Sequence, residues 1–316
     1  MGIFNIFRTI FNIFGKFFGL TLWFFYNLFN NYGLAIVCFT LLIFIIMFPL
    51  EIKRVQTMSK TMRMSKKTKE IREKYAKNKE KLNEELAKFY QEEGTPMQGS
   101  LVQFLSSFVF LGVFAAIRRP LELMFNISKE KISAAQHILV SFSKVSCDIQ
   151  NIQLEIIKRF PEFSGKLTIF DDKDIKNIVD FREGVNFLGL DLLSKPVGSS
   201  FASMLWILPV ICAITALIPL LFKKLNSAMP IDQSGPGQGC AKIIPVILVG
   251  VFVYIVWVNP AALGVYYIVS NLFRLLQSYI VNKFYNVHIY TAKTEAARIA
   301  LLETEEILIS KTITIG

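Results

Sequence analysis

Apolar stretches without charge alternate along the chain with polar, basic segments. The clearest apolar stretch is 33–50, GLAIVCFTLLIFIIMFPL. As a helix rising about 1.5 Å per residue, it is about 27 Å long, enough for the hydrocarbon core of a bilayer. Similar stretches predict four more spans, at about 101–117, 200–222, 243–258 and 261–281. The pattern predicts an all-α integral membrane protein with five transmembrane helices.

Residues 1–20 differ from these spans because polar positions recur among the apolar ones with a helical period, and the segment continues through an apolar, aromatic stretch to Phe29. The apolar side holds Ile3, Phe4, Phe7, Ile10, Phe11, Phe14, Phe17 and Phe18, and the polar side holds Asn5, Arg8, Thr9, Asn12 and Lys16. We therefore expect an amphipathic helix lying in the membrane interface. The alternative, in which residues 10–29 cross the membrane, stays open. We expect no cleaved signal peptide, because charges interrupt the apolar stretch and no small-residue cleavage site follows.

The segment 51–98 is polar and carries 13 Lys and Arg residues. Its pattern predicts two helices, at about 52–76 and 79–93, with Lys77 and Asn78 at the turn between them. Leu82, Leu86 and Phe89 form an apolar stripe on the second helix, which suits packing against the first. We expect a basic helical hairpin that lies largely in water.

The segment 121–198 has mixed charge and is not apolar enough to span. Helices are predicted near 129–160 and 172–182, and Asp171 is placed to cap the second of them. The predicted organisation is an interfacial helix at 1–30, the first span at 31–50, the hairpin at 51–98, the second span at 99–120, an extracytoplasmic helical insertion at 121–198, three further spans at 199–285 and a cytoplasmic tail at 286–316.

Charge gives this arrangement an orientation. The net charge is +11, and the basic residues cluster beside apolar spans, where they attract anionic lipid; contact with ribosomal RNA explains the same charge. With five spans, the basic loops 51–98 and 223–242 lie on the same side as the tail. Because loops rich in Lys and Arg stay in the cytoplasm, we expect the N-terminus outside and the C-terminus inside.

The spans lack the side chains that catalysis or energy coupling requires. They contain no Asp or Glu, and neither histidine, His137 or His288, lies in one. The four cysteines have no metal-ligand or redox spacing, and no Gly-rich phosphate loop is present. We therefore expect no enzyme activity, no cofactor, no metal and no DNA partner, and a function based on binding.

Polar residues are nevertheless scattered through the spans, and the last span has a polar stripe at helical spacing. The candidate residues are Thr40, Gln103, Ser106, Tyr266, Tyr267, Ser270, Asn271, Arg274 and Gln277. Ordinary hydrogen bonding between helices, worth about 0.6 kcal/mol a bond, explains the Ser and Thr residues equally well. Arg274 is costlier, at about 2.5 kcal/mol or more at span depth, so it either reaches the cytoplasmic surface or lines a wet cavity.

Three long motifs resemble the YidC/Oxa family of membrane protein insertases. They are TLLIFIIMFPLEIKRVQTMSK from Thr40, KLNEELAKFYQEEGTPMQGS from Lys81 and PAALGVYYIVSNLFRLLQSYI from Pro260. The resemblance covers about 31–120 and 187–285. It implies an insertase and chaperone of the bacterial plasma membrane, with a hydrophilic groove open to cytoplasm and lipid and closed outside. It also implies nascent membrane proteins, the ribosome and, in some cases, the Sec translocon as partners.

In such a protein Thr40, Tyr266 and Tyr267 fall on positions that line the groove, and Gln103 and Ser106 lie near polar positions of the second span. One departure concerns the cation: the family's groove arginine falls here on Phe44. We therefore hypothesise that Arg274 supplies this charge. Two alternatives remain, a channel or transporter for small solutes, which needs a pore or an ion site, and a scaffold organised by 121–198.

Overall fold

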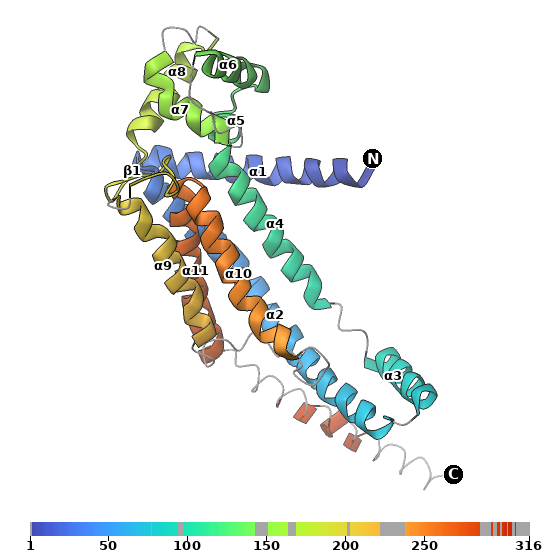
Figure 1. Cartoon of the computed structure of the whole chain (residues 1–316). Helices are drawn as coiled ribbons and strands as arrows, with labels where there is room; N and C mark the ends of the chain where they lie inside the picture. The colour runs from blue at the N-terminus through green and yellow to red at the C-terminus, as the bar shows by residue number, and fades with distance from the viewer. Residues whose placement is uncertain are drawn as a thin grey trace. The chain divides into compact units, whose positions relative to one another are not determined.

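A computed structural model of the chain describes residues 2–76, 78–93, 98–142, 151–163, 169–200, 203–221 and 238–284, together with a few residues between 292 and 307 (Figure 1). Apart from turns and loops, the elements of this part are α-helices, a turn of 3₁₀ helix at Met204–Trp206 and a two-stranded hairpin. Strands β1 (Asn186–Phe187) and β2 (Leu190–Asp191) pair antiparallel, with Asn186 opposite Asp191. The prediction of an all-α protein is confirmed.

Four helices form the N-terminal third: α1 (Gly2–Phe29), α2 (Tyr32–Lys74), α3 (Lys79–Glu93) and α4 (Gln98–Arg118). Separate helices had been expected for the first span and the first arm of the hairpin, with the boundary at Pro49, but α2 is continuous through both. Proline within a helix removes one backbone hydrogen bond, and membrane helices tolerate this loss because neighbouring groups satisfy the freed carbonyl. A proline at the end of an apolar stretch is therefore a poor boundary signal here.

The insertion contains four helices: α5 (Pro120–Leu123), α6 (Lys129–Phe142), α7 (Ile152–Phe163) and α8 (Asp172–Glu183). The single helical stretch expected at 129–160 is thus two helices. Asp171 is the N-cap of α8, as predicted, and its amide donates to the Asp174 carboxylate at 3.5 Å. A carboxylate at this position also suits the positive end of the helix dipole.

The C-terminal third contains α9 (Ile207–Leu221), α10 (Gln238–Val258) and α11 (Ala261–Phe284). Among the described helices, two stretches are long and apolar enough to cross a membrane, Tyr32–Lys53 and Met204–Leu221. Shorter apolar stretches are Ile13–Phe29, Phe108–Arg118 and Pro245–Val258. Helix α11 has the length of a span, 24 residues, but a polar face. The count of five spans stays a prediction.

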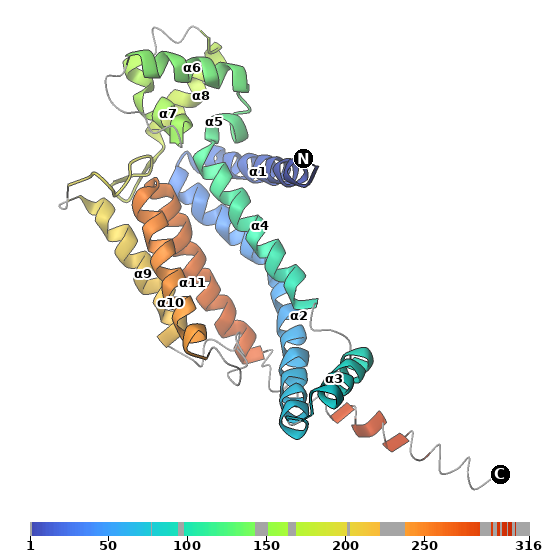
Figure 2. The same cartoon turned by 45° about the vertical axis from the view of Figure 1, so that its right-hand side comes forward.

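The chain divides into two compact units. The first contains residues 1–46, 104–218 and 245–274, and the second contains 47–103, 219–244 and 275–316. In the second unit, α3 lies beside the last turns of α2 in both views, and Phe89 and Met64 are buried (Figures 1 and 2). Phe89 belongs to the predicted apolar stripe, whose other members Leu82 and Leu86 are partly buried, and the basic helical hairpin stays a prediction.

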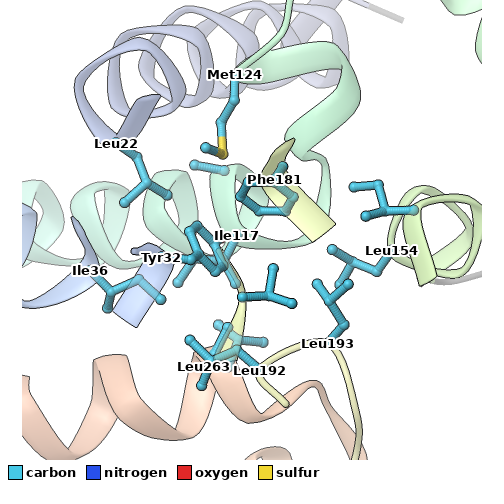
Figure 3. Close-up of a cluster of buried hydrophobic side chains, with 14 of the residues drawn as sticks. Leu22, Tyr32, Ile36, Ile117, Met124, Leu154, Phe181, Leu192, Leu193 and Leu263 are labelled. Carbon is cyan, nitrogen blue, oxygen red and sulfur yellow. The ribbon is translucent and has the colours of Figure 1, made fainter. Parts of the chain in front are cut away.

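The first unit has a continuous core in which the insertion packs on the ends of the apolar helices. Figure 3 shows Leu22 of α1, Tyr32 of α2, Ile117 of α4 and Phe181 of α8 in one cluster, beside Leu263 of α11. Helix α1 runs crosswise to α2 and α4 at this end of the unit (Figures 1 and 2). The crossing is close because Gly19 faces the backbone of Leu123, where any Cβ would overlap the carbonyl group.

Backbone hydrogen bonds also join the insertion to the starts of two helices. The amide of Tyr32, at the start of α2, donates to the Gly184 carbonyl at 2.8 Å. The amides of Ala261 and Ala262, at the start of α11, donate to Ser194 and Leu192 at 2.8 and 3.0 Å. The first amides of a helix have no partner within it, so the insertion satisfies donors that would otherwise be lost on burial.

Candidate functional site

A polar seam joins α9 and α11 in the first unit. The side-chain amide of Asn271 on α11 donates to the Thr215 hydroxyl on α9 at 3.2 Å. That hydroxyl donates in turn to the carbonyl of Ile211, at 2.8 Å. Thr215 was not among the predicted site residues, although a threonine within an apolar span is the kind of signal that could have found it. Asn271 is therefore satisfied by another helix rather than by its own backbone.

Tyr267 lies where three helices meet. Its ring packs on Phe110 of α4 at 5.5 Å between centroids, on Phe252 of α10 at 5.4 Å and on the neighbouring Tyr266 at 5.6 Å. The two phenylalanines were not predicted, because nothing in an apolar stretch distinguishes a ring that contacts a site from one that contacts lipid. The ring contacts therefore hold Tyr267 in place, whereas its hydroxyl makes no hydrogen bond to a described residue.

One hydroxyl on this face of α11 has no protein partner among the described residues. Tyr267 and Ser270 are only 6% and 4% exposed; the Tyr267 hydroxyl makes no hydrogen bond, whereas Ser270 lies beside the Tyr266 hydroxyl without a well-aligned bond. An unsatisfied buried polar group costs about 1–3 kcal/mol, so proteins usually supply a partner, water included. This position therefore favours an incoming polar group.

Thr40 on α2 is fully buried, and its hydroxyl donates to the carbonyl of Ile36 at 2.6 Å. This bond within one helix satisfies the hydroxyl without a partner from elsewhere. Thr40 thus lies in the core of the first unit, and its hydroxyl is hydrogen-bonded to the backbone of its own helix.

Phe44 of α2 reaches α11. Its ring packs on Phe273 at 5.6 Å between centroids, and the next residue along α11 is Arg274. The Arg274 side chain is exposed. The aromatic contact of α2 with α11 thus lies one residue before a cation of α11.

Three predicted residues are not brought to this seam by the described structure. Gln277 is on α11 but belongs to the second unit. Gln103 and Ser106 lie on α4, and their side chains are outside the described part of the chain. Among the described residues, no group of three or more His, Cys, Asp or Glu could hold a metal ion.

The charges of the insertion form a separate cluster. The Lys131 ammonium of α6 lies 2.7 Å from the Asp171 carboxylate and 2.8 Å from that of Asp174, at the start of α8. Hydrogen bonds to these two carboxylates raise the pKa of Lys131 above its ordinary value. These two ion pairs join α6 to α8. Among the described residues, they make no contact with the seam between α9 and α11.

Comparison with known proteins gives a family and named relatives. The sequence model of a family described as "60Kd inner membrane protein" matches residues 24–288. The membrane protein insertase YidC of a strain of Prochlorococcus marinus is 24% identical in an alignment 326 positions long, which covers 82% of this chain and 85% of that protein.

Other relatives match over a shorter region at higher identity. YidC of Syntrophus aciditrophicus is 36% identical over 105 residues, and YidC of Nitratidesulfovibrio vulgaris is 34% identical over 101 residues. These matches cover 33% and 32% of this chain, and 19% of the length of each relative. The chain thus matches only a fifth of the length of these two relatives.

Proposed function

Since this chain belongs to the 60Kd inner membrane protein family, we propose that it is a membrane protein insertase and chaperone, which receives nascent polypeptides in a hydrophilic groove and releases their apolar segments into the bilayer. The observation that carries the proposal is the family match, which runs through 24–288 and includes the whole polar face of α11. Relatives that match 82% or a third of the chain bear the name membrane protein insertase YidC, which supports the same function.

The proposed topology has five spans, formed by the first half of α2 and by α4, α9, α10 and α11. The basic helical hairpin (51–98) and the tail lie in the cytoplasm, and the insertion lies outside. The reason is that loops rich in Lys and Arg stay in the cytoplasm. Helix α1 lies in the outer interface. Its crosswise course supports this placement, and so does its exposed face, where Ile13, Phe17, Phe24 and Leu28 need lipid rather than water (Figures 1 and 2).

In the proposed mechanism, a polar stretch of the nascent chain is received against α11. The buried hydroxyl of Tyr267 is available to it, because no described side chain binds it. Each unsatisfied backbone group in hydrocarbon costs several kcal/mol, so a polar path through part of the membrane removes much of the barrier. An apolar segment then leaves along α9 and α11, driven by the hydrophobic effect without other fuel.

The insertion has a structural part in this mechanism. Its backbone holds the first turns of α2 and α11 together at their outer ends, through Gly184, Leu192 and Ser194. An insertase needs its groove closed outside so that ions do not leak. The insertion's core packing on these ends supports a role as that closure, in preference to the scaffold function weighed from sequence.

We assign the groove cation to Arg274. Phe44, at the position where the family has arginine, is packed on Phe273 and offers no charge. Arg274 follows Phe273 on α11 and is exposed. A cation there attracts acidic segments of a substrate over a Debye length of about 8 Å at physiological salt. No observation favours the channel or transporter alternative, since the spans contain no Asp or Glu.

Site-specific photo-crosslinking tests the function. A crosslinking amino acid at Thr40, Tyr267 or Arg274 is expected to capture ribosome-held nascent membrane proteins, whereas one at Ile247, exposed on α10, is not. Equal capture at Ile247 and Tyr267, or none at any position while the protein is folded in membranes, contradicts the proposal. Repeating the experiment with purified ribosomes, with and without the Sec translocon, tests each partner separately.

A further inference from the structure

The β1–β2 hairpin presents a large apolar side chain at its tip. Leu188 is 76% exposed, more than any other large hydrophobic residue in the described part of the chain. The two turn residues, Leu188 and Gly189, have φ of +51° and +79°. Two-residue hairpin turns of this kind favour Asn-Gly, because a side chain is strained at positive φ. The sequence therefore places leucine where both exposure and backbone conformation disfavour it.

The residue before Leu188, Phe187, is partly buried against the core of the first unit. The Phe187 ring packs against Gly33 at the start of α2, where no side chain would fit. The only charged residue of the two strands, Asp191, is held by Arg182 of α8 at 3.6 Å. Phe187 thus anchors the β1–β2 hairpin to the core, and the Asp191 carboxylate is paired with α8. Leu188 is left exposed at the tip.

The tip continues an apolar surface that belongs to a span. A Cβ added at Gly189 would lie 3.8 Å from the Met204 sulfur, so the tip lies beside the 3₁₀ turn that leads into α9. Met204 is 54% exposed, and the exposed row continues down α9 through Ile207, Val210 and Ile214. Because those α9 residues face lipid in any membrane placement of this helix, Leu188 and Met204 lie at the end of a lipid-facing surface.

Aromatic residues mark the same level. Trp206, two residues after Met204, packs on Trp257 at the end of α10, with ring centroids 6.2 Å apart. Tyr254 packs on Trp257 at 6.1 Å and is exposed. Trp and Tyr gather where the hydrocarbon core meets the headgroups. In both views the hairpin lies at the end of α9 where α1 crosses the unit, so the crosswise helix lies at this level too (Figures 1 and 2).

We propose that the β1–β2 hairpin is a membrane anchor, which inserts Leu188 and Met204 into the lipid at the headgroup boundary of the outer leaflet. It gives the insertion a second attachment to the bilayer, on the side of α9, beside the attachment through α1. The partner is the lipid surface itself, because the patch is apolar, lies at an aromatic belt and is continuous with the surface of a span. The inference needs the membrane placement of α9 but not the insertase activity.

Depth-dependent quenching in bilayers tests it. A fluorophore is attached to Leu188→Cys, with Val140→Cys on α6 as a matched control and Val210→Cys on α9 as the lipid reference. Val140 is also an exposed apolar residue of the insertion, but α6 lies away from α9 in both views. Cys38, Cys147 and Cys240 are replaced by Ala, and the fully buried Cys212 is kept.

Nitroxides on the acyl chains are expected to quench the label at 188 about threefold or more relative to the label at 140, because anchored side chains lie about 5–10 Å into the boundary. Aqueous iodide is expected to show the reverse order. Iodide quenching at 188 equal to that at 140 overturns the proposal. Protection of 188 from both quenchers also overturns it, since another copy of the chain would then cover the hairpin.

A second measurement needs no cysteine. Wild-type protein is irradiated in bilayers that contain a lipid with a diazirine in its acyl chain, and the adducts are mapped by mass spectrometry. Adducts are expected within 186–191 and absent from 129–142. Leu188→Asn keeps a residue that tolerates positive φ, so it is expected to fold and to lose most hairpin adducts while those on α9 remain. The proposal is overturned if the wild-type protein carries lipid adducts on α9 but none within 186–191.

Discussion

Asn271 on α11 donates a hydrogen bond to Thr215 on α9, with 3.2 Å between the amide nitrogen and the hydroxyl oxygen. This is a polar side-chain contact between two largely apolar helices, and the hydroxyl also donates within its own helix to Ile211. The bond is one of the contacts that favour one rotation of α11 about its axis. The rotation decides which α11 side chains, Tyr267 and Ser270 among them, are buried.

The strength of this contact is measurable with a double-mutant cycle. Asn271→Ala and Thr215→Val are expected to show a coupling energy of about 0.6 kcal/mol, and no more than about 1.7 kcal/mol, in the free energy of unfolding in bicelles. Thr40→Val combined with Asn271→Ala is the control, because the Thr40 hydroxyl bonds within α2. Coupling in the control as large as in the pair would mean that the seam is not a specific contact.

Removing the buried hydroxyl of Tyr267 separates stability from function. Tyr267→Phe keeps the ring contacts and deletes a hydroxyl that has no described partner, so the free energy of unfolding is expected to rise by about 1 kcal/mol. Insertion of a substrate with a polar segment is expected to fall several-fold in proteoliposomes. The proposed role in receiving substrate is wrong if insertion is unchanged.

Tyr32→Phe is the matched control for this prediction. Its hydroxyl is also buried without a described partner, but the side chain lies in the core beneath the insertion, beside Phe181 (Figure 3). The same gain in stability is expected, with no change in insertion. A fall in insertion for both variants would indicate that rigidity, rather than the Tyr267 hydroxyl, controls the activity.

The sequence predicts most of this fold because membrane spans and amphipathic helices leave strong periodic signals. The interfacial pattern of 1–20 lies on one helix, α1, and Asp171 is the cap that its position before α8 predicts. The polar stripe of α11 is likewise visible as a spacing of three and four residues. These features are local, so neighbouring residues alone determine them.

What the sequence does not predict depends on contacts between distant segments. The β1–β2 hairpin has strands of two residues, too short to alternate, and its turn lacks the usual Asn-Gly. The carbonyls that cap α11 come from Ser194 and Leu192, and no local pattern marks a backbone group as a cap for another helix. The continuation of α2 through Pro49 was missed because proline is also a common end signal.

Gly19 tests the docking of α1. A Cβ there would overlap the backbone of Leu123, which cannot rotate away as a side chain can. Gly19→Ala is therefore expected to lower stability by about 1–3 kcal/mol, seen as a fall in Tm of roughly 3–8 °C in detergent. Gly250→Ala on α10, where a Cβ meets nothing within 4 Å, is expected to be neutral or stabilising by up to about 1 kcal/mol. Equal effects of the two substitutions would contradict this close packing.

The contact of Lys131 with Asp171 and Asp174 makes the stability of the insertion fall at alkaline pH, where Lys131 loses its charge. The two carboxylates raise the pKa of Lys131, so its contribution to stability is complete below the unfolded value of about 10.4 and is lost as the pH rises through the folded value. The difference in Tm between wild type and Lys131→Met is expected to shrink from about pH 10 upward. Lys173→Met, an exposed position on α8, serves as control and is expected to match wild type throughout. A difference that stays constant with pH would exclude this titration.

The position of the groove cation is testable by moving it. Arg274→Ala is expected to reduce insertion of a substrate with an acidic tail by about tenfold, because a single favourable charge interaction is worth about 1–2 kcal/mol where water is partly excluded. Arg274→Lys is expected to retain most of the activity, and a substrate with a neutral tail is expected to be little affected by either change. Lys283→Ala, which removes a cation lower on the same helix, is the control for net charge.

The decisive variant is Phe44→Arg in the Arg274→Ala background. Phe44 packs on Phe273, one residue before Arg274, so an arginine at position 44 would put a cation on α2 at the same level along α11. Insertion of the acidic substrate is expected to recover at least half of its wild-type rate. Such recovery cannot come from improved packing, since Phe44→Arg removes an aromatic contact, and Phe44→Leu, which also removes it, is expected not to restore insertion. Failure of Phe44→Arg in a folded protein, or equal rescue by Phe44→Leu, would show that Arg274 does not act as the cation of the groove.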